Sequence, residues 1–302
     1  MWRRISLLSC AAVLAFAQSD SSFGLRVDST LVVVPVTVTD STNRFILGLD
    51  RKDFQLFEDG AEQRIQQFGG EDAPLSIGLL VDVSGSMGAK IETSREAVAE
   101  FLKTMNLQDE AFLIEFSDQA KLITGFTKKM AEIRDKLQSM ESQGLTALLD
   151  AVDLGLVEMK RARNPRKALL IISDGGDNHS RYTAKEIKDL VREADVQIYS
   201  MGVFERLPGL RLTQAELSGP HLLSEISEQT GGRAIAASNS AALPGIARRI
   251  GIELRNQYIL AYAPSNEQHD GKYRHVQVKL KQPEALPPLK TRWRLGYYAP
   301  TR

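Results

Sequence analysis

The chain has 302 residues, of which 43% are hydrophobic and 25% are charged. This composition is typical of a folded globular protein and excludes a disordered or fibrous one. The 38 Lys and Arg residues balance the 38 Asp and Glu residues, and no long basic run is present. Neither a nucleic acid nor an anionic membrane surface is therefore indicated as a partner.

The first 17 residues have the features of an export signal. Arg3 and Arg4 precede an apolar stretch at residues 5–16, and Ala15-Phe16-Ala17 fits the small-x-small pattern of a cleavage site. The apolar stretch is shorter than the roughly 20 residues that a transmembrane helix needs. We therefore expect residues 1–17 to be a signal peptide, and the mature chain to start near Gln18 as a periplasmic or secreted protein without a transmembrane segment.

The only cysteine, Cys10, offers an alternative to simple export. Leu7-Leu8-Ser9-Cys10 resembles a lipoprotein box, which would tether the protein to the cell envelope through a lipidated Cys10. Only five residues separate Arg4 from Cys10, fewer than the ~7 to 15 of a normal apolar region. This spacing favours cleavage near Ala17, which leaves a mature chain without cysteine and hence without disulfides.

Residues 18–73 are expected to form an all-β segment. The run LVVVPVTVTD at residues 31–40 is rich in β-branched side chains and partly alternating. Residues 53–60 and 63–68 predict a hairpin that turns at Asp59-Gly60.

Residues 74–256 alternate between strand and helix patterns. We predict strands at residues 75–83, 111–116, 121–124, 168–172, 196–203 and 233–237, and helices at residues 89–105, 128–140, 148–159, 184–193, 222–229 and 242–253. Residues 204–220 are expected to be an irregular crossing. The pattern predicts an α/β fold with a doubly wound, mostly parallel sheet that helices cover on both faces.

Residues 257–302 return to strand patterns, at residues 257–262, 273–281 and 291–298. Three strands here and three before residue 74 are each too few for a stable sandwich. We expect the two segments to pair as one small sandwich-like β domain, with the α/β domain inserted between its halves. The alternative is that the two ends pack separately against the central sheet.

Three polar segments of the α/β part predict a divalent-cation site. They are Asp82-Val83-Ser84-Gly85-Ser86, Gly144-Leu145-Thr146 and Ser173-Asp174-Gly175. Two of them follow predicted strands, whose carboxyl ends meet at the ligand crevice of a doubly wound sheet. Carboxylates and hydroxyls are hard oxygen ligands that suit Mg²⁺, with Mn²⁺ or Ca²⁺ as alternatives, and exclude metals that prefer thiolates. The predicted ligand residues are Asp82, Ser84, Ser86, Thr146 and Asp174.

Each segment also has a simpler interpretation. Ser84-Gly85-Ser86 could cap the helix that follows, and Asp174-Gly175 could be an ordinary turn after a strand. Asp177-Asn178-His179 could line the rim of the site or hold a second cation, but its spacing does not fit the EF-hand pattern. For these last three residues we expect a solvated loop.

The motifs resemble a known family. Asp82-Val83-Ser84-Gly85-Ser86-Met87, Thr146 and Asp174 are similar to the DxSxS, Thr and Asp elements of the metal-ion-dependent adhesion site in von Willebrand factor A domains. The flanking segments VPVTVTD, GLDRKDFQLFEDG, YILAYAPSNEQHDGKYRHVQVKLK and LGYYAP resemble a group of exported bacterial von Willebrand factor A proteins best known from Acidobacteria.

The resemblance implies a role for each residue. Ser84 and Ser86 would coordinate Mg²⁺ through their hydroxyls, Thr146 would do so directly or through water, and the two acids would hold coordinated waters. An open coordination position would accept an Asp or Glu carboxylate of a partner protein.

We therefore expect an exported, Mg²⁺-dependent protein-binding module of the adhesion type. The alternative is a structural or assembly scaffold of the cell envelope, in which the metal only stabilises the fold. An enzyme is not expected, because the chain has neither a GxSxG elbow nor a GxxxxGK[ST] loop. In addition, Ser84 stands where aspartate-based phosphatases have a second Asp.

Overall fold

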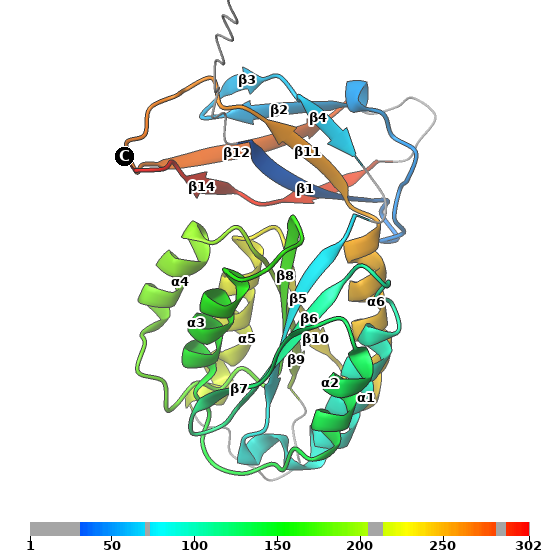
Figure 1. The fold of residues 1–302 in the computed structure, drawn as a ribbon, viewed down its shortest axis with the longest axis vertical. Coiled ribbons are helices and arrows are strands. Elements are labelled where there is room, and N and C mark those ends of the chain that lie inside the picture. The colour runs from blue at the N-terminus through cyan, green and yellow to red at the C-terminus, as the bar shows by residue number, and fades with distance from the viewer. Residues whose placement is uncertain (1–30, 70–72, 205–213, 282–287, 302) are drawn as a thin grey trace, which may run out of the picture. The chain divides into compact units, whose positions relative to one another are not determined.

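A six-stranded sheet organises the described part of the chain, which in this computed structural model comprises residues 31–69, 73–204, 214–281 and 288–301. The expected signal peptide, its cleavage site and Cys10 lie outside these residues. The strand order is β10-β9-β8-β5-β6-β7, and every neighbouring pair is parallel except β6 and β7 (Figure 1). The strands are β5 (Leu75–Asp82), β6 (Glu110–Phe116), β7 (Ala120–Thr127), β8 (Arg166–Ser173), β9 (Gln197–Val203) and β10 (Arg233–Ala237).

The central strands are buried on both faces. All eight residues of β5 and all seven of β9 are buried, as their mostly apolar sequences predict. Leu79 lies opposite Leu113 on one neighbouring strand and opposite Leu170 on the other. This register stacks aliphatic side chains across the middle of the sheet.

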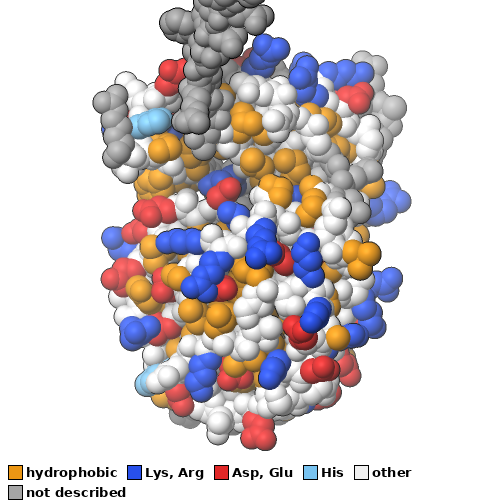
Figure 2. All heavy atoms as spheres, in the orientation of Figure 1, with side chains coloured by type: hydrophobic (Ala, Val, Ile, Leu, Met, Phe, Trp, Pro, Cys, Tyr) orange, Lys and Arg blue, Asp and Glu red, His pale blue; other side chains and the backbone are white. Residues whose placement is uncertain are grey.

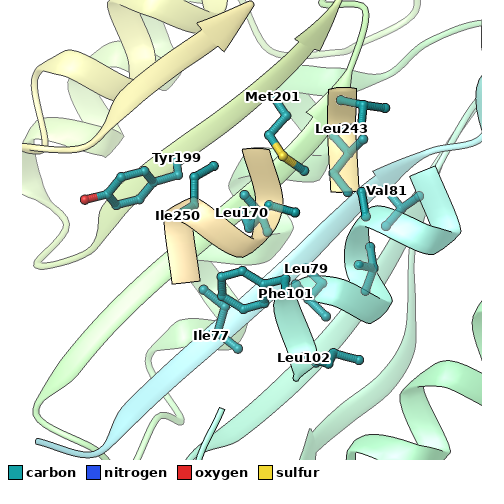
Figure 3. Close-up of a cluster of buried hydrophobic side chains, with 14 of the residues drawn as sticks. Ile77, Leu79, Val81, Phe101, Leu102, Leu170, Tyr199, Met201, Leu243 and Ile250 are labelled. Carbon is teal, nitrogen blue, oxygen red and sulfur yellow. The ribbon is translucent and has the colours of Figure 1, made fainter. Parts of the chain in front are cut away.

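Helices cover the sheet in two layers. One face carries α1 (Ile91–Leu102), α2 (Met130–Gln138) and α6 (Leu243–Arg255), and the other carries α3 (Leu148–Met159), α4 (Ala184–Glu193) and α5 (Gln214–Glu228). Figure 3 shows the first layer, where Phe101 of α1 and Ile250 of α6 pack with Leu79 of β5. The predicted fold class is therefore confirmed, and α3 and α4 have the predicted bounds.

Two further sheets are antiparallel and four-stranded, with the strand orders β13-β1-β11-β4 and β14-β12-β2-β3. They pack together as a sandwich. Their strands are β1 (Val32–Thr39), β2 (Phe54–Glu58), β3 (Ala61–Gln63), β4 (Gln67–Gly69), β11 (Tyr258–Tyr262), β12 (Tyr273–Leu280), β13 (Lys290–Trp293) and β14 (Gly296–Tyr298). Strands from before and after the α/β part pair directly, β1 with β11 and β2 with β12. Val36, Leu56, Tyr262 and Val278 share the core of this sandwich.

The hairpin prediction was right at its turn and wrong in its second arm. Asp59 and Gly60 have φ angles of 47° and 85°, the left-handed pair that a tight two-residue hairpin needs. The returning strand β3 ends at Gln63, and Gln67–Gly69 joins β11 of the other sheet instead.

Two further element predictions were wrong. Residues 291–298 were predicted as one strand but divide into β13 and β14, which belong to different sheets. Arg294 lies between them, where its guanidinium donates to the Gly296 carbonyl and pairs with Asp195. Residues 205–213 of the predicted irregular crossing lie outside the described residues, and its last part is helical, because α5 begins at Gln214 and contains Pro220 in its interior. Gly219 of this helix allows close approach to the site, since a Cβ there would lie 2.7 Å from the Asp174 carbonyl oxygen.

A buried polar network joins the amino ends of the central strands to the sandwich. The Glu253 carboxylate of α6 is fully buried and accepts hydrogen bonds from Arg233 of β10 and Arg292 of β13. The Gln257 side chain accepts from Arg166 Nη2 at 3.2 Å and donates to Thr37 Oγ1 at 3.2 Å. The polar segments predicted to bind metal lie at the opposite, carboxyl ends of the strands.

Among the described residues, no helix combines the length and the apolar character needed to cross a membrane. Figure 2 shows acidic and basic side chains interspersed over one face of the molecule. This distribution agrees with the balanced charge of the sequence.

Candidate metal centre

Asp82 ends β5 at the point where the order of the parallel strands reverses. From β5 the chain proceeds to β6 on one side, and β8 later pairs on the other side, which is the location of the ligand crevice in such sheets. Asp82 is fully buried. Its Oδ1 accepts from the Ser84 amide at 2.9 Å, and its Oδ2 accepts from Ser173 Oγ at 2.5 Å. Both carboxylate oxygens are thus held in fixed directions.

Ser84 and Ser86 present their hydroxyls to each other. The two Oγ atoms are 3.1 Å apart, Ser84 is 1% exposed and Ser86 is exposed at the surface. Ser84 makes no side-chain capping bond to the 3-10 segment Gly85–Lys90 that follows, and the residue that precedes α1 is Lys90. The helix-cap interpretation of these serines is therefore wrong.

Thr146 lies in a loop that is bonded on both sides. Gly144 has a φ of +82°, and a Cβ there would lie 2.6 Å from the Asp118 carboxylate, which accepts from the Leu145 amide. The Gly144 carbonyl accepts from the Gly85 amide at 2.9 Å. The Thr146 amide donates to Asn178 Oδ1 at 2.8 Å.

Asp174 directly follows β8 and is 6% exposed. Its Oδ1 accepts from the Gly176 amide at 3.4 Å, and its Oδ2 lies 3.5 Å from Lys90 Nζ. Gly175 has a φ of +78°, and a Cβ there would lie 2.8 Å from the backbone of Gly219. The chain can therefore bend tightly next to Asp174 only because residue 175 is glycine.

Hydrogen bonds tie the three predicted segments together. Asp82 accepts from Ser173, Gly85 donates to Gly144, and Thr146 donates to Asn178 in the loop that follows Asp174. All five predicted ligand residues are thus placed in adjoining loops at the carboxyl edge of the sheet.

Asp82 has no cationic partner at ion-pair distance among the described residues, whereas Asp174 pairs with Lys90. Burial raises the pKa of Asp82 to about 7, hydrogen bonds from Ser173 and Ser84 oppose this, and the nearby charge of Asp174 raises it further. A cation beside the Asp82 carboxylate would stabilise its ionised form. The described residues contain no group of three or more His, Cys, Asp or Glu side chains that could hold a metal. Two carboxylates and three hydroxyls form a hard donor set of the kind that suits a divalent cation such as Mg²⁺.

The expectation of a solvated loop at Asp177-Asn178-His179 is confirmed in that Asn178 and His179 are exposed and lie in a loop, but this loop also bonds to Thr146. The Thr146 carbonyl accepts from the amides of Asn178 and His179, both at 3.0 Å. The Asp177 carboxylate accepts from Ser180 Oγ at 2.5 Å, and Ser180 Oγ accepts from the Leu149 amide at 3.0 Å. This loop therefore clamps Thr146 and satisfies the first turn of α3.

Two residues around the site, Lys90 and Asp118, were not identified from the sequence, and two others, Ser173 and Asn178, were named there without the contacts that the structure gives them. Each acts through a partner at least 27 positions away, such as Asp118 with Leu145. Ser173 had the clearest signal, because it directly precedes Asp174 at the end of a buried strand. Lys90 and Asn178 differ from ordinary surface residues only once the fold is known.

Comparisons with known proteins show which family and fold the chain resembles. Residues 77–176 match the family model of the von Willebrand factor type A domain. Inter-alpha-trypsin inhibitor heavy chain H3 of Pongo abelii is 26% identical over 145 residues, which cover 43% of this chain and 17% of that one. An uncharacterized protein of Borreliella burgdorferi is 24% identical over 181 residues, covering 53% of each chain. The matches thus span about a sixth to a half of these relatives.

Two solved structures share the fold. The von Willebrand factor type A protein from Catenulispora acidiphila superposes with a TM-score of 0.53 at 12% identity, covering 82% of this chain and 72% of that one. Proximal thread matrix protein 1 from the mussel byssus gives a TM-score of 0.51 at 18% identity, covering 66% and 51%. The α/β part of this chain therefore has the von Willebrand factor A fold, and the findings support a von Willebrand factor A domain protein.

Proposed function

We propose that the chain is an exported protein-binding module that uses Mg²⁺ to capture an Asp or Glu carboxylate of a partner protein. Von Willebrand factor A domains are often protein-interaction modules and commonly bind a divalent metal at a site of this kind. Mn²⁺ and Ca²⁺ offer the same hard-cation chemistry.

The observation that carries the proposal is the joining of three loops around two buried acids. Ser84, Ser86 and Thr146 would hold the ion through their hydroxyls, and Asp82 and Asp174 would supply the negative charge. When bound, the ion supplies a positive charge that attracts a carboxylate oxygen of the partner. Ser86 is exposed, so the site can be reached from the surface.

The rim of the site suggests what surrounds the captured acid. Leu145 directly precedes Thr146, and its side chain is 47% exposed. A partner segment that placed an acid over the hydroxyls would contact this leucine. We propose that apolar side chains next to the acid contribute to binding.

We propose binding without catalysis. Among the described residues, the hydrogen bonds of Ser84, Ser86 and Ser173 include none to a histidine, the usual base for an activated serine. The Asp82 carboxylate is engaged by Ser84 and Ser173 and is buried, which suits a structural anion better than a nucleophile.

Export is part of the proposal. It rests on the signal-like residues 1–17 and on the resemblance of the flanking segments to exported bacterial von Willebrand factor A proteins known from Acidobacteria. The expected location is the periplasm or the medium, with or without association with the cell envelope.

Affinity capture tests the proposal. The mature chain is immobilised, incubated with the envelope fraction of the source cell in Mg²⁺, and eluted with a chelator. A partner should elute with the chelator, bind again when Mg²⁺ is restored, and fail to bind Asp174→Ala. Asp135→Ala is the matched control, because Asp135 is exposed on α2 and is not one of the predicted ligands.

The outcome also separates the two functions. Binding of the same partner with and without chelator, and equally by Asp174→Ala, would contradict a metal-dependent module. That result would favour the scaffold alternative, in which the ion only stabilises the loops. Turnover of a phosphate or ester substrate that depended on Asp82 would contradict both.

A further inference from the structure

Lys90 places a positive charge inside the candidate metal centre. Its Nζ lies 3.5 Å from Asp174 Oδ2 and donates a hydrogen bond to the Val203 carbonyl at 3.2 Å. The side chains of Lys90 and Asp174 are 12% and 7% exposed. The ammonium is therefore held between the predicted ligand and the end of β9, away from bulk solvent.

Lys90 contributes a positive charge next to the two buried acids, Asp82 and Asp174. Asp82 receives its hydrogen bonds from neutral groups, the Ser84 amide and the Ser173 hydroxyl. Within the described residues, Lys90 is the cationic side chain at ion-pair distance from either acid. The ammonium thus pairs with Asp174 and leaves Asp82 without a cationic partner among the described residues, and the attraction between Lys90 and Asp174 is stronger than at a solvent-exposed pair.

We propose that Lys90 is a built-in counter-ion that competes with the divalent cation for Asp174. This inference rests on the proposed metal-binding function and concerns the regulation of the same site. When the divalent cation is absent, the ammonium neutralises Asp174 and keeps the loop after β8 in place. When the cation binds, it shares the crevice with a like charge, so its affinity is lowered.

The consequence is a site that fills only when the divalent-cation concentration is high. A cell exterior rich in Mg²⁺ or Ca²⁺ would load it, and a dilute medium would leave Lys90 paired with Asp174. Partner capture would then depend on the ionic composition of the surroundings. The three loops of the site would stay joined with or without the cation. The hydrogen bonds from the amides of Gly85 and Thr146 that join them do not involve Lys90.

A purely structural role for Lys90 makes a different prediction. If the ammonium only anchored the end of β9 through the Val203 carbonyl, its loss would loosen the site and weaken cation binding. If it competes with the cation, its loss must strengthen cation binding. The sign of the change in affinity therefore separates the two roles.

Calorimetric titration of MgCl₂ into the metal-stripped chain is the test. Lys90→Met keeps the length of the side chain and removes its charge, and it should bind Mg²⁺ about tenfold more tightly than the unmodified chain. Lys90→Arg keeps the charge and should retain weak binding. Lys103→Met is the matched control, because Lys103 follows α1 and is exposed, and it should leave the affinity unchanged.

Thermal unfolding gives a second measure of Mg²⁺ binding that does not depend on the heat of titration. In chelator, Lys90→Met should unfold at a lower temperature than the unmodified chain, and saturating Mg²⁺ should raise its unfolding temperature by a larger amount. Should Lys90→Met fail to fold, Lys90→Gln supplies the same loss of charge with a polar end group.

The failures of the two proposals can be distinguished. If the unmodified chain binds Mg²⁺ and Lys90→Met binds it equally or more weakly, the counter-ion inference is overturned and the metal site stands. If the unmodified chain binds no Mg²⁺, the proposed function is overturned. In that case gain of binding by Lys90→Met supports the inference, and continued absence of binding overturns it as well.

Discussion

The two ends of the central sheet both bury acidic side chains, but they neutralise them differently. At the amino end, one acid, Glu253, is held by two guanidinium groups, those of Arg233 and Arg292. At the carboxyl end, the ammonium of Lys90 pairs with Asp174, and Asp82 has no cationic partner among the described residues. The acid at the amino end is therefore neutralised by the protein itself, whereas Asp82 at the carboxyl end is not. This difference separates a structural network from a candidate binding site.

The largest effect is expected at the amino end. Glu253→Ala leaves two arginines without their buried partner, and it should lower the free energy of unfolding by about 4 kcal/mol. Urea denaturation with and without Mg²⁺ measures the change, which should be the same in both conditions. Glu96→Ala, on the exposed face of α1, is the control. If Mg²⁺ restored the stability that Glu253→Ala loses, the two ends of the central sheet would not be independent.

The second effect is the stabilisation by Mg²⁺ at the carboxyl end. At a concentration one hundred times its dissociation constant, the ion should raise the free energy of unfolding by about 2.7 kcal/mol. Asp174→Asn should abolish this increase, because it removes one of the two anions of the site. Thermal unfolding across a Mg²⁺ series provides the measurement. If Mg²⁺ stabilised Asp174→Asn as much as the unmodified chain, the ion would be bound at a different site.

The third effect is a pH dependence of the ion-free chain. Folding raises the pKa of Asp82 from 3.8 to about 7, so the folded chain binds a proton that the unfolded chain has lost. The contribution of Asp82 to stability should fall as the pH rises through this window, by up to about 1.4 kcal/mol per pH unit.

Asp82→Asn should remove this contribution, and the difference between the two chains in chelator, followed from pH 4 to pH 8, isolates it. Saturating Mg²⁺ should reduce the slope, since the ion favours the ionised carboxyl. Identical pH profiles for the two chains in chelator would show that Asp82 is not responsible.

The smallest effect is expected at the loop clamp. Asn178→Ala removes the acceptor for the Thr146 amide and should cost about 1 kcal/mol of stability. Because Thr146 is then less well positioned, the affinity for Mg²⁺ should fall roughly tenfold. His179→Ala, which leaves the backbone bond to Thr146 in place, is the matched control. If Asn178→Ala and His179→Ala lost similar amounts of stability and of affinity for Mg²⁺, the Asn178 side chain would have no specific role.

Much of the fold follows from local patterns. The mostly apolar sequence of β5 and the amphipathic pattern of α4 need no distant information, and the bounds of both elements were predicted within one residue. The errors arose where tertiary contacts override local preference. Gly219 and Pro220 suggest a break, yet the close approach of Gly219 to Asp174 occurs within a helix. Residues 291–298 look like one strand, but they contribute to two sheets.

In the candidate site, too, some residues can be identified from local sequence patterns and others only from tertiary contacts. Asp82, Ser84 and Ser86 are adjacent in sequence, so their spacing alone points to a shared ligand, and Asp174 follows a strand that was predicted. The residues that support them come from elsewhere. Asn178 reaches Thr146 across 32 positions, and Lys90 reaches Asp174 across 84. No local pattern marks such pairs, because their meaning depends on which loops the sheet brings together.

The most direct test of the metal site is anomalous X-ray scattering from crystals of the mature chain soaked in Mn²⁺. A single strong peak is expected within bonding distance of the Ser84 and Ser86 hydroxyls and next to Asp82 and Asp174. It should be absent from crystals of Asp174→Asn. The absence of a peak at these oxygens in the unmodified chain, or a peak confined to the Asp177-Asn178-His179 segment, would contradict the site.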